Sequence, residues 1–448
     1  MSYNKRPAFR WGTHFKDGKL YLATKQSVTV VKGWPDLRAW QKTAAGPEWI
    51  SVRPEIQIKP ASVQTGRSAR RGSPRLEMPD YIRELDVEAM VRENPGAEPL
   101  NPERTVAQAA HRERCEQAEE AEFEALSSFF SGIPVQVRGL VGEFACRQWH
   151  IAVLLLRCPG AFDLVHINPA LAFCLASNRT FRSPRPTQPL RDARRWICRR
   201  QRDIAGWLGF PATERTVNLL RKIPPEACNL TTLLQLRRVL HQTAVADSMS
   251  QLPRLTATVL CVVTDPRLRP LASTRLLREL SNSIMEWGVV SSRVRILQDT
   301  LEMAATLVPP RQLPVFDSLA QLTRHHDRLA AELNLKVPSA QEPVEFPKPP
   351  IQGSETIVPL TVPAMLAEEG REQQNCVVTY AKCVARGNQF IYRVLAPERA
   401  TLQIMRTQQG WQIGELSGPR NRPVSPATRI AVEQWIAGDG WDKDWAPF

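Results

Sequence analysis

Long apolar runs are missing from this sequence. No stretch reaches the roughly twenty apolar residues that an α-helix needs to cross a bilayer, and the best candidate, residues 151–156, is far shorter. Residues 1–15 also contain no apolar core of the kind found in secretory signals. We therefore expect no membrane span, no membrane partner and a cytoplasmic location.

Paired cysteines and familiar catalytic motifs are missing too. The nine cysteines are scattered, with no CxxC pair and no Cys/His spacing typical of a zinc site. This pattern predicts reduced thiols and neither a metal nor a cofactor. No P-loop, GxSxG or HExxH motif occurs. Whether the chain is an enzyme therefore stays open.

Basic charge is plentiful and unevenly placed. The formal net charge is +14, and residues 1–75 alone contain 15 Lys and Arg against 4 Asp and Glu. Residues 76–125 have the opposite balance, with 5 basic and 14 acidic residues. An excess of basic charge favours polyanion partners such as nucleic acid, without indicating any sequence preference.

Residues 1–60 have the pattern of a small β-rich unit. Two segments, 19–35 and 48–60, alternate apolar and polar residues and are rich in β-branched side chains. Lysines and arginines interleave with aromatic residues, as on surfaces that bind single-stranded nucleic acid. An ordinary small sheet whose polar face is rich in lysine is the alternative interpretation.

The middle of the chain is predicted to be helical. Residues 61–125 are predicted to be a basic linker followed by an acidic helix. Residues 126–335 are predicted to be a helical domain whose helices end at prolines, because proline disrupts a helix interior. His325 and His326 are expected to be exposed on a polar helix. Together with the termini, these segments predict a mainly helical α+β protein.

Arginines are densest between residues 182 and 202. A guanidinium group can form two parallel hydrogen bonds to a phosphate, so the arginines of this segment and of the linker are candidate nucleic-acid-binding residues. They are Arg191, Arg194, Arg195, Arg199, Arg200 and Arg202, with Arg67, Arg70 and Arg71 in the linker. Pairing with the acidic residues of 76–125, or plain solvation, is the alternative interpretation.

Residues 336–356 are a Pro-rich linker, and residues 357–448 are predicted to form an independent α+β module. We expect Thr361 to cap a short helix ending at Gly370, and Ser425 to cap the last helix. Between them the pattern predicts a helix over 372–386 and a three-stranded antiparallel meander over 389–395, 399–405 and 411–417.

This module resembles a known family. Its polar residues follow the order EG-x4-NCV-x2-Y-x6-G, then YRV, RATL and W-x-I-x-E-L-x-G-x2-N, which is similar to the C-terminal signature of the PcfJ-like proteins. Residues 219–240 resemble the helical region before it. The resemblance implies a protein of a plasmid or other mobile element. This sequence departs from the family at Asn375, Gln403 and Glu415, where His, Glu and Gln are common.

The same polar residues form a candidate site. They are Asn375, Cys376, Tyr380, Arg393, Thr401, Gln403, Glu415 and Asn421, with Glu369 beside them. Helix and strand periodicities place Cys376 against the sheet, near Tyr380 and the strand surface that presents Thr401 and Gln403.

Three functions remain open. The first is an accessory protein that associates with nucleic acid and with another protein of the same mobile element. The second is a structural or interaction module in which the polar set forms a buried hydrogen-bond network. The third is a thiol-dependent enzyme with Cys376 as nucleophile, which lacks a nearby base in the sequence because no histidine follows His326.

Overall fold

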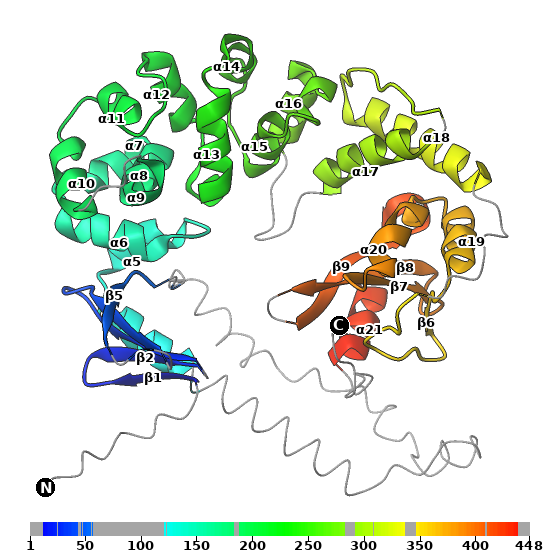
Figure 1. Ribbon diagram of the computed structural model, residues 1–448, viewed down its shortest axis with the longest axis horizontal. Helices are drawn as coiled ribbons and strands as arrows, with labels where there is room; N and C mark the ends of the chain where they lie inside the picture. Colours follow the sequence, from blue (N-terminus) through cyan, green and yellow to red (C-terminus); the bar gives the residue numbers. More distant parts are fainter. Residues whose placement is uncertain are drawn as a thin grey trace, which may run out of the picture. The chain divides into compact units, whose positions relative to one another are not determined.

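The computed structural model describes residues 12–24, 26–43, 46, 48–54, 56, 121, 123–182, 188–282, 292–307, 309–336, 346–407 and 410–437. Over these residues, the expected mainly helical α+β fold is confirmed, with a sheet near each end and helices between them (Figure 1). None of the described helices is both long and apolar enough to cross a membrane.

Contacts divide the chain into two compact units, residues 1–250 and 251–448. This division falls inside the predicted helical domain of 126–335, whereas the sequence pattern places a boundary at the Pro-rich segment 336–356. The last helices of the predicted helical domain therefore belong to the unit that contains the C-terminal sheet.

A five-stranded antiparallel meander opens the first unit, in the order β1-β2-β3-β4-β5. Its strands are β1 (Gly12–Lys16), β2 (Lys19–Ala23), β3 (Ser27–Lys32), β4 (Ala39–Thr43) and β5 (Ile50–Val52). Asp17 and Gly18 both have positive φ, as a tight hairpin turn requires. Leu20 and Val31 pair across β2 and β3 and are fully buried, so one face of the sheet forms a core.

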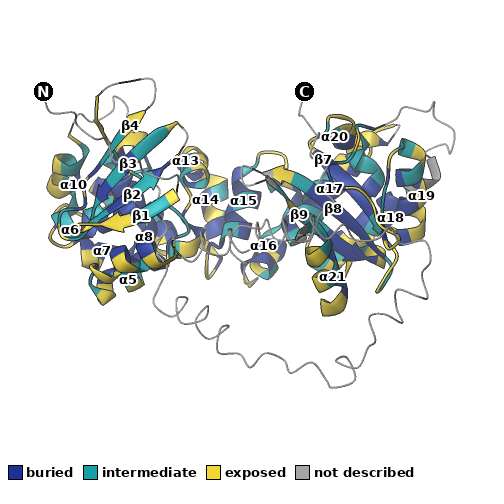
Figure 2. Ribbon diagram, turned by 90° about the horizontal axis from the view of Figure 1, so that it is seen from below, coloured by how far each residue is buried: buried dark blue, intermediate teal, exposed yellow. Residues whose placement is uncertain are grey.

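Helices make up the rest of the first unit. They are α5 (Val135–Gly142), α6 (Gln148–Arg157), α7 (Ala161–Ile167), α8 (Pro169–Ala176), α9 (Asn178–Phe181), α10 (Pro189–Ile197), α11 (Gln201–Trp207), α12 (Glu214–Arg221), η1 (Pro225–Ala227), α13 (Leu230–Val239) and α14 (Thr243–Ser250). Pro169, Pro189 and Pro225 each stand at a helix start, where a missing backbone N–H costs nothing. Every residue of α8 is buried (Figure 2), and helices α6, α7 and α12 pack against it.

The second unit begins with helices. They are α15 (Ala257–Thr264), η2 (Arg269–Leu271), α16 (Thr274–Ser281), α17 (Ser292–Thr306) and α18 (Leu319–Lys336). The remaining elements are β6 (Ile357–Pro359), α19 (Pro363–Gln373), η3 (Val377–Tyr380), α20 (Ala381–Ala385), β7 (Gln389–Val394), β8 (Ala400–Thr407), β9 (Gly410–Gly418), η4 (Pro419–Asn421), β10 (Arg422–Pro423) and α21 (Pro426–Ala437).

The C-terminal sheet is antiparallel, in the order β10-β9-β8-β7-β6. The predicted meander is confirmed as β7, β8 and β9, and the short strands β6 and β10 extend it at both edges. Alternation separates its faces: Tyr392, Leu402 and Ile404 share one core with Val432 of α21. The opposite face presents polar side chains, and these line the candidate site.

The bounds of two predicted helices were wrong. Val362 rather than Thr361 is the N-cap of α19, and this helix continues past Gly370 to Gln373. The predicted helix over 372–386 is split, because Gln374 adopts a left-handed conformation with φ of 50°. Asn375 then begins a new turn, since its side-chain Oδ1 accepts a hydrogen bond from Val377 N at 3.2 Å. At the last helix, Ser425 accepts from Thr428 N at 3.3 Å, so the predicted cap is confirmed.

Candidate functional site

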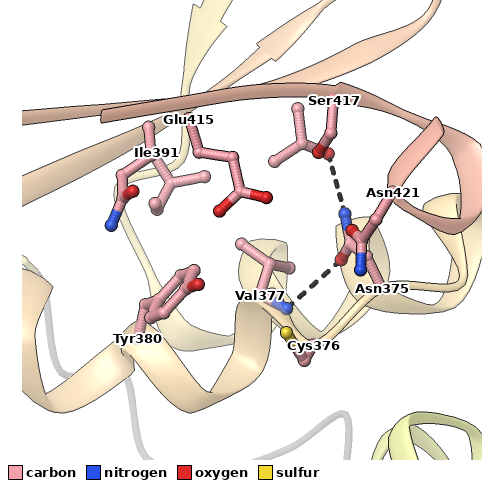
Figure 3. A pocket seen from close by; sticks show the side chains of 10 residues that line it. Asn375, Cys376, Val377, Tyr380, Ile391, Glu415, Ser417 and Asn421 are labelled. Carbon is pink, nitrogen blue, oxygen red and sulfur yellow. Dashed lines mark hydrogen bonds between the residues drawn. The ribbon is translucent and has the colours of Figure 1, made fainter. Parts of the chain in front are cut away.

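A small pocket of about 20 Å³ lies on the polar face of the C-terminal sheet (Figure 3). It is lined by Asn375, Cys376, Val377, Tyr380, Ile391, Thr401, Gln403, Glu415, Ser417 and Asn421. Seven of the eight predicted site residues line this pocket; Arg393 does not, and neither does Glu369. Figure 3 shows the Glu415 carboxylate and the Tyr380 hydroxyl pointing toward the same space.

A buried carboxylate organises one side of this polar set. Glu369, on α19, is fully buried and accepts hydrogen bonds from Arg393 Nε at 2.8 Å and from both terminal nitrogens of Arg399, at 3.0 and 2.6 Å. Thr401 Oγ1 also donates to Glu369, at 2.7 Å, and accepts from Asn375 Nδ2 at 3.1 Å. These groups satisfy one another, as a structural network requires.

The thiol of Cys376 faces away from that network. It packs with Met303 of α17 and Leu329 of α18, and its Sγ donates to Asp299 Oδ2 at 3.7 Å. Cys376 was expected to lie against the sheet. It lines the pocket there, but its sulfur meets the two helices because it precedes η3 instead of lying within a continuous helix.

His326 was expected to be exposed, and this was wrong: its side chain is 1% exposed. A ring nitrogen of His326, a carboxylate oxygen of Asp299 and the sulfur of Cys376 all lie within 4.8 Å of one another. Sequence reasoning missed both partners because they come from α17 and α18. The signal for His326 was its position on the apolar stripe of α18, four residues after Leu322 and three before Leu329.

Acidic groups dominate the electrostatics near Cys376. Burial and the neighbouring Glu415 raise the pKa of Asp299 to about 7. Burial, with Asp299 and Glu415 close by, also raises the pKa of the Cys376 thiol well above its usual value. Arg295 of α17 supplies a compensating cation, since its Nη1 lies 3.0 Å from Glu415 Oε2. The thiol is therefore protonated at neutral pH in this arrangement.

The arginine surface lies in the first unit, on α10, α11 and the turn between them. Arg191, Arg194, Arg195, Arg199 and Arg200 are exposed and Arg202 is half-exposed. Arg194 donates to the carbonyl of Arg157, and Arg202 pairs with the adjacent Asp203 at 3.7 Å. Among the described residues, no acidic side chain pairs with Arg195, Arg199 or Arg200.

Aromatic rings accompany this arginine surface. The half-buried Trp196 and Trp207 stack with ring centroids 5.0 Å apart, and the guanidinium of Arg182 lies over Trp207. Arg67, Arg70 and Arg71 lie outside the described residues, and so does the acidic stretch 76–125 proposed as an internal partner, except for residues 121 and 123–125.

Comparison with known proteins gives no identification: no family model, no curated protein and no solved structure matches this chain. The resemblance to PcfJ-like proteins stays a prediction from the sequence.

Proposed function

We propose that this protein binds nucleic acid through the arginine surface, as a cytoplasmic accessory protein of a plasmid or other mobile element with a PcfJ-like C-terminal module. The observation that carries the proposal is the group of three arginines, Arg195, Arg199 and Arg200, beside the Trp196–Trp207 stack. Guanidinium groups contact phosphates, and a partly exposed indole offers a face on which a base stacks.

The contacts of Lys32, on β3 of the N-terminal sheet, support a smaller role for this lysine. Lys32 is paired with Asp36 at 3.3 Å and lies over the ring of Trp40. Its charge is therefore partly compensated, whereas Arg195, Arg199 and Arg200 have no such carboxylate among the described residues. The proposal accordingly assigns phosphate contacts first to α10 and α11.

A thiol-dependent reaction is not proposed. Cys376 is 4% exposed, and the pocket beside it has room for about one water molecule. The Glu369 network instead supports the structural interpretation for Arg393, Thr401 and Asn375.

The test is salt-dependent binding of a fluorescent single-stranded oligonucleotide. We expect affinity to fall steeply with salt, because each phosphate contact releases counterions and adds about 0.7 to the logarithmic slope. Replacing Arg194, Arg195, Arg199 and Arg200 by Ala should weaken binding at least tenfold and flatten the slope.

A matched control removes the same charge elsewhere. Replacing Arg238, Arg275, Arg324 and Arg429, four exposed arginines on other helices, by Ala should preserve most of the affinity. Equal losses in both variants would show that only net charge matters, and would contradict the assignment to α10 and α11.

A further inference from the structure

We propose that Asp299, His326 and Cys376 bind a zinc ion. The three side chains come from α17, from α18 and from the residue before η3, all within the second unit. Their potential ligand atoms lie within 4.8 Å of one another, and the Asp299 to Cys376 distance is already 3.7 Å. Tetrahedral zinc with bonds of about 2.0–2.3 Å separates its ligands by roughly 3.3–3.7 Å, a spacing that the Asp299 and Cys376 atoms already have.

The donor set selects the class of metal. A carboxylate oxygen, an imidazole nitrogen and a thiolate sulfur are the three ligand types that zinc accepts in proteins. Magnesium and calcium prefer oxygen ligands and do not favour a thiolate. Three protein ligands leave a fourth position, which a water molecule would take.

His326 is held in the form that a metal requires. Its Nδ1 lies 3.2 Å from Asp327 Oδ1, so a proton on Nδ1 satisfies this contact. Nε2 is buried and has no hydrogen-bond partner among the described residues. Metal-binding histidines commonly donate their second N–H to a carboxylate in this way. A buried nitrogen lone pair without a donor is costly, and coordination removes that cost.

All three side chains are buried. The exposed fractions are 8% for Asp299, 1% for His326 and 4% for Cys376. Binding converts the Cys376 thiol to a thiolate and releases its proton to water, while the neutral imidazole supplies a lone pair. The ion would join α17 and α18 to the C-terminal module.

The first experiment measures metal in the full chain. Protein expressed with added zinc and dialysed should retain one zinc per chain. Replacement by Co²⁺ should give the sulfur-to-cobalt charge-transfer band and the visible bands of tetrahedral cobalt. Zinc should raise the Tm, because it binds the folded chain better than the unfolded one.

Matched neighbours provide controls. Cys376→Ser and His326→Gln should abolish the cobalt charge-transfer band and stoichiometric zinc, whereas Cys383→Ser and His325→Gln should retain both. Asp327→Asn keeps all three ligands and should weaken zinc roughly 10–100-fold, so it tests the site even if a ligand variant fails to fold.

Several results would overturn the site. Wild-type protein without retained zinc and without a cobalt–thiolate band has no such site, and equal losses in the control variants would place the metal elsewhere. Fast alkylation of Cys376 that depends on His326, with no cobalt band, would identify a thiol–imidazole nucleophile instead.

Discussion

Glu369 shows how a single buried charge can organise a polar face. Its carboxylate is fully buried and bonds to Arg393, Arg399 and Thr401. Removing one member of a buried ion pair leaves the other charges without compensation and costs about 3–5 kcal/mol. We expect Glu369→Gln to lower the free energy of unfolding by an amount of this order, measured by urea denaturation.

The neighbouring residue is the control. Glu368 also contacts Arg393, at 3.2 Å, but its side chain is 52% exposed. Exposed pairs contribute about 0–1 kcal/mol, so Glu368→Gln should change stability little. Equal effects of the two substitutions would contradict the special role of the buried carboxylate.

His150 makes the first unit sensitive to acid. Burial, with the nearby charges of Arg147 and Arg53, lowers the pKa of His150 to about 3. The unfolded chain, with a histidine pKa near 6.5, therefore binds the proton more readily between these values. The stability contributed by neutral His150 is fully present above about pH 6.5 and is lost as the pH falls toward 3.

Urea unfolding of wild-type protein and His150→Gln at pH 7 and pH 5 checks this. Between these pH values the wild type should lose about 2 kcal/mol more than the variant. His166→Gln, at an exposed position, should behave like the wild type. Identical pH dependence in all three proteins would contradict the prediction.

The turn between α19 and η3 is the element that positions the candidate site. Asn375 holds it through Val377 N and joins it to β8 through Thr401. Asn375→Ala removes both hydrogen bonds and leaves buried groups without partners, so we expect a loss of about 1–3 kcal/mol. Thermal unfolding measures this, with the exposed Asn388→Ala as control. An unchanged Tm for Asn375→Ala would show that the turn does not need its side chain.

Elements with a local signal could be predicted from the sequence. The meander follows from alternation over β7, β8 and β9, and the cap at Ser425 follows from its place before Pro426. Alternation also placed Thr401 and Gln403 opposite the apolar core. The left-handed Gln374 carries no such signal, so the break between two helices was missed. Strand β6 contains three residues and β10 two, too few to show a period.

At the scale of the whole molecule, the sequence could not show which helices pack on the C-terminal module. The polar set was predicted because its members lie close together along the chain. Asp299 and His326 join it only through the packing of α17 and α18, and such distant contacts leave no local period. The predicted boundary at 336–356 rested on its proline content and on the helix caps expected in residues 357–448.

Two fragments, residues 251–448 and residues 357–448, test whether the C-terminal unit begins at residue 251 or after the Pro-rich segment 336–356. Removing α17 and α18 exposes the apolar side of Cys376 and its neighbours. Each large apolar side chain left in water lowers the free energy of unfolding by about 1.5–3 kcal/mol. We expect residues 251–448 to unfold cooperatively by circular dichroism. Residues 357–448 should be largely unfolded and bind a hydrophobic dye. A cooperative, dye-free 357–448 fragment would support the independent module that the sequence pattern predicts.

Because Cys376 is buried between two helices and the module, its labelling rate can measure local opening of the second unit. We expect a thiol reagent to reach this sulfur when α17 or α18 separates from its neighbours. In metal-free protein, the ratio of its labelling rate to that of a free thiol gives the equilibrium between closed and open forms, as hydrogen exchange does for backbone amides. One cysteine thus reports how often the second unit opens.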